Sequence, residues 1–373
     1  MTLADLGAEV IKVEHPVGGD ETRSWGPPFA GGESSYFLSV NRGKRSVALD
    51  LKDPEGGQLA LELCARADVV IENFRAGSAA RLGLDYDAVR KRRADVVDCT
   101  ISGFGEREPR DRPGYDFTVQ AESGLMSITG EPGGEPLKVG VAVVDVLTGL
   151  NAAAAILAAL NRRDRSGDGE RIELSLLDSA FAALVNVAEN ALVTGEEPVR
   201  YGNAHPSIVP YQTFSTADGG IAVAAANDGL YRRLCAAIGR PELADDERYA
   251  TNGQRVRNRE ALVAELESVF AARSAAEWLR VLLAAGVPAG EIRGVRTALA
   301  SEGSATTTVS HPTAGSLPLV RPPFSFSRAS LDPPEAPPLL GQHTAEVLAE
   351  LGVDENRLAA LERRGVIARP TPA

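Results

Sequence analysis

The chain has 373 residues, of which 44% are hydrophobic and 24% charged, so it is long enough for two or three domain-sized units with substantial cores. Its net charge of −12 argues against a nucleic acid or an anionic membrane as partner, because there is no basic surplus to neutralise phosphates. The three cysteines, Cys64, Cys99 and Cys235, are scattered, which favours neither a disulfide framework nor a cysteine-rich metal site and suits a reducing compartment.

Four short segments in the first hundred residues are rich in Val and Ile and bounded by turn residues, a pattern that predicts buried strands. They are residues 9–15, 45–51, 68–74 and 96–102. Helical patterns stand between them, including residues 54–67 and 86–94. Strand, helix and strand at this spacing indicate parallel βαβ units. We therefore predict an α/β fold whose large domain is a Rossmann-like parallel sheet.

The next segments continue the large domain. Helices are predicted at residues 115–128 and 145–163, and residues 171–192 read as a strand that runs into a helix. After Gly195 the pattern changes to an antiparallel hairpin at 208–226, followed by amphipathic helices to residue 285. This second part predicts a smaller α+β domain.

The last quarter of the chain supplies a connection and two terminal helices. Residues 303–338 are rich in Pro, Ser and Thr and predict an extended connection. We place the domain boundaries accordingly. The large domain comprises residues 1–195 and 325–373, the small domain 205–300, and the linkers 196–204 and 301–324.

Neither a secretory leader nor a membrane span is predicted. No charged segment followed by an apolar one opens the chain, and no apolar run approaches ~18 uninterrupted residues. We expect a cytoplasmic protein. The four histidines, at 15, 205, 311 and 343, are far apart in sequence and without i,i+4 pairing, so we expect no metal site.

Asp145 stands out in VGVAVVDVLTGLNAAAAILAAL, residues 139–160, as the one charge in a run of Val, Leu and Ala. An ionised carboxylate among apolar residues needs a structural partner or a chemical task. Asp is a favoured N-cap, and on spacing alone the residue reads as the cap of a helix that begins there. A reactive carboxylate is the alternative.

A second candidate site lies in ENFRAGSAARLGLDY, residues 72–86. A predicted strand ends at Asn73 and Phe74, and the following turn carries Arg75 and Arg81. Ligands of parallel sheets bind beyond the carboxyl ends of the strands, where an aromatic ring, an amide and two guanidiniums could hold an adenine nucleotide with its phosphates. The alternative is a surface turn with two solvated arginines.

Several segments together resemble one family, the family III CoA-transferases of the CaiB/BaiF type. They occur in the family's order over almost the whole chain, and they read LADLGAEVIKVEHPVGGDETRSWGPPF, SVNRGKRSVALDLKDPEG, VVIENFRAGSAARLGLDY, PGYDFTVQAESGLMSITG, PLKVGVAVVDVLTGLNAAAAILAAL and PPLLGQHTAEVL. The family usually begins with a further strand, which this sequence does not show. The resemblance implies interlocked homodimers.

The resemblance also implies a mechanism and a set of site residues. The catalytic carboxylate falls on Asp145, which would attack an acyl-CoA thioester and pass through an anhydride and an aspartyl-CoA thioester. CoA is then a substrate, and no tightly bound cofactor is expected. The family's CoA contacts fall on His15, Leu49, Lys52, Asn73, Phe74, Arg75, Arg81, Tyr115 and Asp116.

The same fold also hosts 2-methylacyl-CoA racemases, which carry a histidine where Tyr115 stands. A phenol with a pKa near ~10 is a poor base, so Tyr115 favours acyl transfer over racemisation. A catalytically inactive CoA-binding subunit is a further alternative.

Within the family, residues 200–219 and 249–262 resemble the succinate–hydroxymethylglutarate CoA-transferases. This likeness implies CoA transfer between dicarboxylic acids, with succinyl-CoA as donor. A distal carboxylate calls for a cation or a hydrogen-bond donor, and Arg42, Arg200 and His205 are the candidates.

Overall fold

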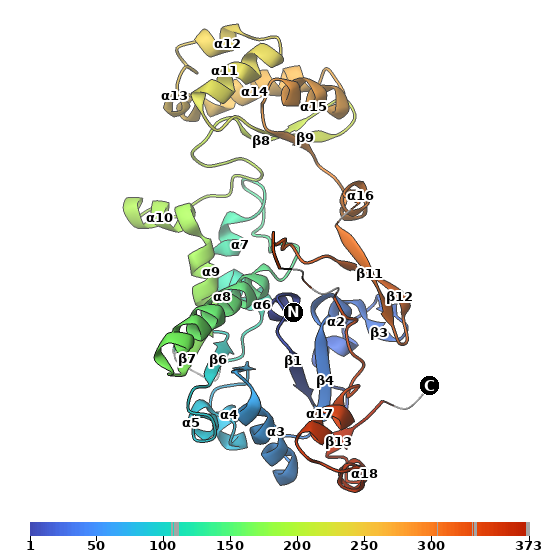
Figure 1. The fold of residues 1–373 in the computed structure, drawn as a ribbon. Helices are drawn as coiled ribbons and strands as arrows, with labels where there is room; N and C mark the ends of the chain where they lie inside the picture. Colours follow the sequence, from blue (N-terminus) through green and yellow to red (C-terminus); the bar gives the residue numbers. More distant parts are fainter. Residues whose placement is uncertain (106, 108–111, 304, 330, 332–333, 371–373) are drawn as a thin grey trace. The chain divides into compact units, whose positions relative to one another are not determined.

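The computed structural model describes the chain except for residues 106, 108–111, 304, 330, 332–333 and 371–373. The chain divides into two compact units. Unit 1 comprises Met1–Ser123, Gly140–Val185 and Glu302–Ala373, and unit 2 comprises Gly124–Val139 and Asn186–Ser301. Both ends of the chain therefore contribute to unit 1 (Figure 1).

The first sheet of unit 1 is built from both ends of the sequence. Strands β1 (Val10–Glu14) and β4 (Lys44–Leu49) pair in parallel, and β13 (Ile367–Ala368) pairs antiparallel with β4. The helices α3 (Pro54–Arg66), α17 (Thr344–Glu350) and α18 (Glu355–Arg363) accompany this sheet. Its core contains Val47, Leu59, Leu348 and Leu361, all at most 1% exposed.

The second sheet of unit 1 is wholly parallel. Strands β5 (Val69–Glu72), β6 (Val97–Ser102) and β7 (Glu170–Ser175) pair in that order. The long helix α8 (Val143–Ser166) packs on its apolar face, where Cys99 contacts Ala152 and Ile156. Short helices α4 (Ser78–Leu82), α5 (Tyr86–Arg90) and α9 (Leu176–Ala183) complete this part. The predicted strands and the α/β class are confirmed.

The structure differs from the sequence-based prediction in two segments. Residues 306–320 form a hairpin, β11 (Thr306–His311) and β12 (Gly315–Val320), where an extended connection was predicted. Leu317 and Leu319 of β12 pack on Leu38, which explains why this Ser- and Thr-rich segment is ordered. The predicted helix at 115–128 is broken into α6 (Asp116–Glu122) and α7 (Leu125–Ile128), because Gly124 takes a φ of +85° that ends the first helix.

Small elements complete the N-terminal part of unit 1. They are α1 (Thr2–Asp5), the 3-10 helix η1 (Glu21–Ser24), the strands β2 (Phe29–Ala30) and β3 (Glu33–Ser34), and α2 (Ser35–Val40). The side chain of Ser34 accepts a hydrogen bond from Tyr36 N at 3.1 Å, which starts α2 at this point.

Unit 2 has its own α+β core. The hairpin predicted around Asp218 is present as β8 (Tyr211–Ser215) and β9 (Gly220–Ala224), with β10 (Ala289–Glu291) pairing antiparallel with β9. Six helices belong to the described part of this unit besides α7, and they are α10 (Val185–Thr194), α11 (Asp228–Ala237), α13 (Asn252–Arg257), α14 (Arg259–Phe270), α15 (Ala275–Ala284) and α16 (Val295–Ser301), with the single turn α12 (Glu242–Asp245). Trp278, Phe214 and Phe270 fill the core.

Helix α8 is long and apolar enough to cross a membrane by length and composition alone, and the bent pair of α9 and α10 would pass the same test as one span. Core helices of soluble proteins also meet these criteria. Here Val144, Ala152 and Ile156 of α8 are buried inside unit 1, as in a core helix that covers a sheet.

Candidate active site

The first turn of α8 carries Asp145, but the residue is not the helix cap. The helix begins at Val143, and the N-cap residue Ala142 has no side-chain oxygen to offer. Asp116 takes this role from α6: its Oδ1 accepts hydrogen bonds from Val144 N at 2.8 Å and from Asp145 N at 3.3 Å. The prediction that Asp145 caps the helix is therefore wrong, because a buried carboxylate from another element already satisfies these amides.

The Asp145 carboxylate is left available for chemistry. Within the described residues, no side-chain hydrogen bond or ion pair engages it. The residue is exposed in part, yet surrounding protein atoms withhold water from the carboxylate and, together with the negative charge of Asp116, raise the pKa of Asp145 to about 6. The positive end of the α8 dipole acts in the opposite direction and favours the ionised form.

One aromatic side chain, Tyr36, interacts electrostatically with this carboxylate, and two more, Trp25 and Tyr115, belong to the same part of unit 1. Burial raises the pKa of Tyr36, and the charges of Asp145 and Asp116 raise it further, which places its hydroxyl within the field of both carboxylates. Tyr36 meets Trp25 edge to face, with 5.0 Å between the ring centroids. Tyr115, 56% exposed, donates a hydrogen bond from Oη to Glu21 Oε2 at 3.3 Å.

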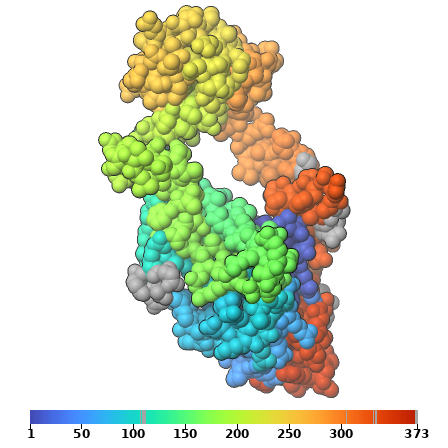
Figure 2. All heavy atoms as spheres, turned by 60° about the vertical axis from the view of Figure 1, so that its left-hand side comes forward, coloured from blue at the N-terminus to red at the C-terminus, as the bar shows by residue number. Residues whose placement is uncertain are grey.

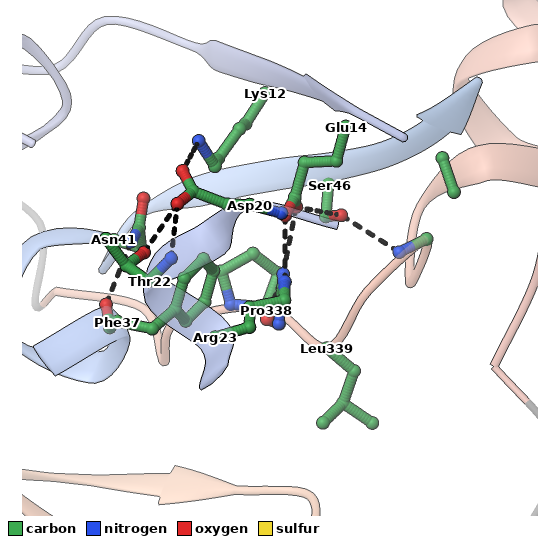
Figure 3. A network of polar contacts seen from close by, with 12 residues as sticks. Lys12, Glu14, Asp20, Thr22, Arg23, Phe37, Asn41, Ser46, Pro338 and Leu339 are labelled. Atoms are coloured by element: carbon green, nitrogen blue, oxygen red, sulfur yellow. Dashed lines mark hydrogen bonds and ion pairs between the residues drawn. The ribbon is translucent and has the colours of Figure 1, made fainter. Parts of the chain in front are cut away.

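A buried polar network fixes the segment that carries Glu21 and Trp25 (Figure 3). The guanidinium of Arg23 in η1 donates to both oxygens of Glu14 at 2.8 and 2.9 Å, and Ser46 Oγ donates to the same carboxylate at 2.7 Å. These three side chains are almost fully enclosed, since the Arg23 and Glu14 side chains are 9% and 1% exposed. Two flanking strands thereby hold η1 in place.

A second ion pair holds the turn that leads into η1. Lys12 Nζ lies 2.6 Å from Asp20 Oδ2, and Asp20 Oδ1 accepts hydrogen bonds from Thr22 N at 2.9 Å and Thr22 Oγ1 at 2.6 Å. Burial works against the ionised Asp20, but these partners outweigh burial and lower the pKa of Asp20 to about 2. Asp20 is thus ionised at any ordinary working pH.

Three of the predicted CoA contacts lie at the carboxyl ends of β1 and β4. The register pairs Glu14 with Ala48, so His15 and Leu49 follow at the same edge of the sheet, with Lys52 in the next turn. His15 and Lys52 are exposed, as a phosphate contact requires. The Leu49 side chain is 1% exposed and belongs to the core, so only its main chain is available to a ligand.

The predicted residues after β5 lie at a large cavity in unit 1. Phe74 and Arg75 line this space of ≈ 770 Å³, while Asn73 and Arg81 are exposed beside it. One wall is the polar face of the second sheet, where the register places Asp98 beside Arg171 and Thr100 beside Glu173. A parallel sheet seldom leaves a polar face beside open space unless a ligand or another chain covers it. In the described part of the chain, no cluster of His, Cys, Asp or Glu could hold a metal ion.

Comparisons with known proteins identify the family of the chain. The model of CoA-transferase family III matches residues 1–344. The chain belongs to this family. It is 43% identical to the succinyl-CoA:glutarate CoA-transferase of Mus musculus, over 98% of this chain and 86% of that protein, and 45% identical to the succinate–glutarate CoA-transferase of Agrobacterium fabrum, over 94% and 90%. The crystal structure of a CAIB/BAIF family protein from Brucella suis superposes with a TM-score of 0.81 at 44% identity, covering 94% of this chain and 93% of that one.

The three residues predicted to bind the distal carboxylate of a dicarboxylic substrate of this CoA-transferase differ in their surroundings. Arg42 is buried in unit 1, where Nε and Nη2 each donate to one oxygen of Asp5 at 2.7 Å and Nη1 donates to Val320 O at 2.6 Å. Its place in the structure disagrees with the prediction, because a buried guanidinium paired with Asp5 serves the fold rather than a ligand.

Arg200 and His205 belong to unit 2. Arg200 Nη1 donates to Ser127 O at 3.1 Å and its Nε donates to Glu131 O at 3.4 Å, so the guanidinium binds main-chain carbonyls of α7 and of the segment that follows it. His205 Nδ1 accepts from Ser207 N at 3.0 Å, and its ring lies 5.5 Å from that of Tyr211. Both residues are half-buried, but among the described residues no hydrogen bond engages His205 Nε2, whereas the Arg200 guanidinium is fully engaged with main-chain carbonyls.

Sequence reasoning missed Trp25, Tyr36 and Glu21. No local pattern marks them, since Glu21 and Tyr36 join the site through interactions with residues far along the chain, and Trp25 joins it through its contact with Tyr36. Only the structure points to two of them as candidate ligand contacts, because the Trp25 and Tyr36 side chains remain 40% and 39% exposed although both are large and aromatic.

Proposed function

We propose that this family III CoA-transferase moves CoA between dicarboxylic acids, with succinyl-CoA as donor and a glutarate-class acid as acceptor, through covalent chemistry at Asp145. The observation that carries the proposal is the Asp145 carboxylate itself, which lies at a helix N-terminus, has its pKa raised to about 6 and accepts no hydrogen bond or ion pair from the side chains that the structure describes. The names of the mouse and Agrobacterium relatives support the choice of substrates.

The reaction exchanges one thioester for another and needs no ATP. Asp145 attacks the thioester carbonyl of the donor, the C–S bond breaks, and CoA leaves as the thiolate, so that a mixed anhydride of Asp145 and the donor's acid is formed. The thiolate then attacks the Asp145 carbonyl, which releases the first acid and leaves an aspartyl-CoA thioester. The carboxylate of the acceptor attacks this thioester and forms a second anhydride. CoA thiolate attacks the acceptor's carbonyl, and the new acyl-CoA departs from a regenerated carboxylate.

The raised pKa of Asp145 suits a nucleophile. At pH 7, one unit above a pKa of about 6, roughly nine-tenths of the carboxylate is ionised. A more basic carboxylate is also a stronger nucleophile, so partial desolvation increases reactivity while the α8 dipole keeps the ionised form accessible.

We propose that unit 1 binds CoA. The carboxyl ends of β1 and β4 would supply His15, the Leu49 main chain and Lys52, and the cavity after β5 would supply Asn73, Phe74, Arg75 and Arg81. Tyr115 would lie beside the thioester, held by Glu21. His205 is the candidate in unit 2 for the distal carboxylate of the acid.

We also propose a cytoplasmic homodimer. The outer face of α8 carries Val146, Leu150 and Leu157, which are 56%, 46% and 46% exposed and lie along one side of the helix from Asp145 onward. Figure 2 shows green atoms of this region at the surface of unit 1. An apolar stripe of this kind is typical of a surface that a second subunit covers.

Exchange of labelled succinate into succinyl-CoA, without added free CoA or ATP, tests the proposal. We expect exchange with the wild type, loss of at least about 1,000-fold in Asp145→Asn, and wild-type rates in Asp164→Asn, which changes an exposed acid at the other end of α8. Wild-type exchange in Asp145→Asn would reject the mechanism. Rapid α-hydrogen exchange of a 2-methylacyl-CoA in deuterated water, without CoA transfer, would instead support a racemase.

A further inference from the structure

The N-terminus of α8 is capped from outside the helix. Ala142 offers no side-chain acceptor, and two amides of the first turn, those of Val144 and Asp145, both point to one oxygen of Asp116, 28 and 29 residues earlier in the chain. Asp116 opens α6 and is only 8% exposed. The main chain of the proposed nucleophile is therefore bound directly to a second carboxylate.

We propose that Asp116 is a positioning residue for CoA transfer: its carboxylate fixes the first turn of α8, and its negative charge faces Asp145 and makes that carboxylate more reactive. This inference rests on the proposed function, because it assigns Asp116 an effect on Asp145 as the nucleophile. The sequence predicted a contact between Asp116 and CoA; we propose instead that Asp116 acts on other residues of the protein.

The contacts of Asp116 leave it little freedom. While Oδ1 accepts from the two α8 amides, Oδ2 accepts from Gln120 Nε2 at 2.6 Å, one turn along α6. The same Gln120 nitrogen lies 3.4 Å from Val141 O, in the segment that enters α8. Asp116 and Gln120 thus bind both sides of the point where the helix starts. A helix end held by charge-assisted hydrogen bonds has a fixed position, and so has the Cα of Asp145.

Titratable and polar groups from three elements act on Asp145. Asp116 approaches from α6, Tyr36 from α2, and the amides of the first turn belong to α8 itself. Burial makes the largest contribution to the raised pKa of Asp145, and the charge of Asp116 makes the second. Removing that charge should lower the pKa of Asp145. The carboxylate would then stay ionised at lower pH but would be a weaker nucleophile.

Asp116→Asn removes the charge and keeps the contact with α8, because an amide oxygen can still accept from the Val144 and Asp145 amides; only the hydrogen bond from Gln120 is lost, since the amide nitrogen of Asn cannot accept it. The pH profile of kcat/KM for the donor acyl-CoA should move its acid limb to lower pH, with a lower plateau near pH 8. Titration of the donor cancels in the comparison with the wild type. Asp354→Asn is the matched control. Asp354 caps α18 by accepting a hydrogen bond from Arg357 N at 2.8 Å, so the same substitution is made at a helix start remote in sequence from Asp145, and the pH profile should stay that of the wild type.

Asp116→Glu is the second variant and keeps the charge while displacing the oxygen by one methylene. Its acid limb should stay at the wild-type pH, and its plateau should fall by about 10- to 100-fold through misplacement of the nucleophile. An acid limb in Asp116→Asn that coincides with the wild type, or wild-type rates in Asp116→Glu, would overturn the inference. Trapping of acylated Asp145 in the wild type with hydroxylamine separates the two proposals, since its absence would refute the proposed function itself.

Discussion

The pH dependence of acyl transfer is the sharpest consequence of the surroundings of Asp145. Only the ionised carboxylate attacks a thioester, and burial together with Asp116 raises the pKa of Asp145 to about 6. A carboxyl with a pKa of about 6 is roughly 9% ionised at pH 5, whereas one at its ordinary value of 3.8 would be roughly 94% ionised. The reaction rate should therefore fall about tenfold between pH 8 and pH 5.

The quantity to measure is kcat/KM for the donor acyl-CoA, since it reports groups that titrate in the free enzyme and in the free donor. A donor without a second carboxylate removes titration of the acyl group from the range of interest. Intrinsic tryptophan fluorescence at each pH would verify that the protein stays folded. A rate that stays constant from pH 8 to pH 5 would show that the nucleophile has an ordinary pKa, and the argument from burial and Asp116 would fail.

Three further predictions concern stability and substrate binding. Glu14→Gln should lower the free energy of unfolding by roughly 3 kcal/mol in urea at pH 7, because it leaves the Arg23 guanidinium buried without its main partner. Burial opposes the ionised Glu14, but hydrogen bonds from Arg23 and Ser46 outweigh it and lower the pKa of Glu14. The stabilisation is therefore present above the unfolded pKa near 4.5 and should disappear as the pH falls further. A difference in unfolding free energy between wild type and Glu14→Gln that persists at pH 2 would count against this argument. Arg42→Met should destabilise unit 1 by about 3 kcal/mol, because it leaves Asp5 buried without its partner. The ratio of the KM for dicarboxylates to the KM for monocarboxylates should not change. A rise in KM for dicarboxylates alone would restore Arg42 as a substrate contact. Asp145→Asn should keep or raise the melting temperature at pH 7, because a raised pKa means that the ionised Asp145 disfavours the folded state above pH 6. Any gain in melting temperature should vanish at pH 4. A clear loss of stability at pH 7 would indicate a structural role for Asp145.

The sheets were predictable because their strands carry a local signal. β1, β5 and β6 fall within the predicted segments and β4 begins one residue earlier, at Lys44, since short segments rich in Val and Ile between turn residues mark buried strands. The hairpin of β11 and β12 was not, because Pro318 stands inside β12 opposite Thr308 and the segment is rich in Ser and Thr. In a two-stranded ribbon both strands are edges, so a proline is tolerated there, and the composition resembles that of a loop.

The candidate site divides in the same way. Asp145 could be singled out from its neighbours, because a lone acid in an apolar run is visible in the sequence. The residue that caps α8 could not, since Asp116 reaches the helix from 29 residues away and the local pattern pointed to Asp145 instead. Trp25 and Tyr36 share this limitation. Their contact depends on the turn between η1 and α2, which the buried Arg23 and Glu14 pair holds in place.

Covalent modification of Asp145 is the most direct measurement of the central claim. The protein would be incubated with succinyl-CoA and hydroxylamine, or reduced with borohydride, and its peptides analysed by mass spectrometry. We expect a hydroxamate, or the alcohol from reduction, on the peptide that contains Asp145, and neither product in Asp145→Asn. CoA exchange at full rate with that peptide unmodified would contradict the account.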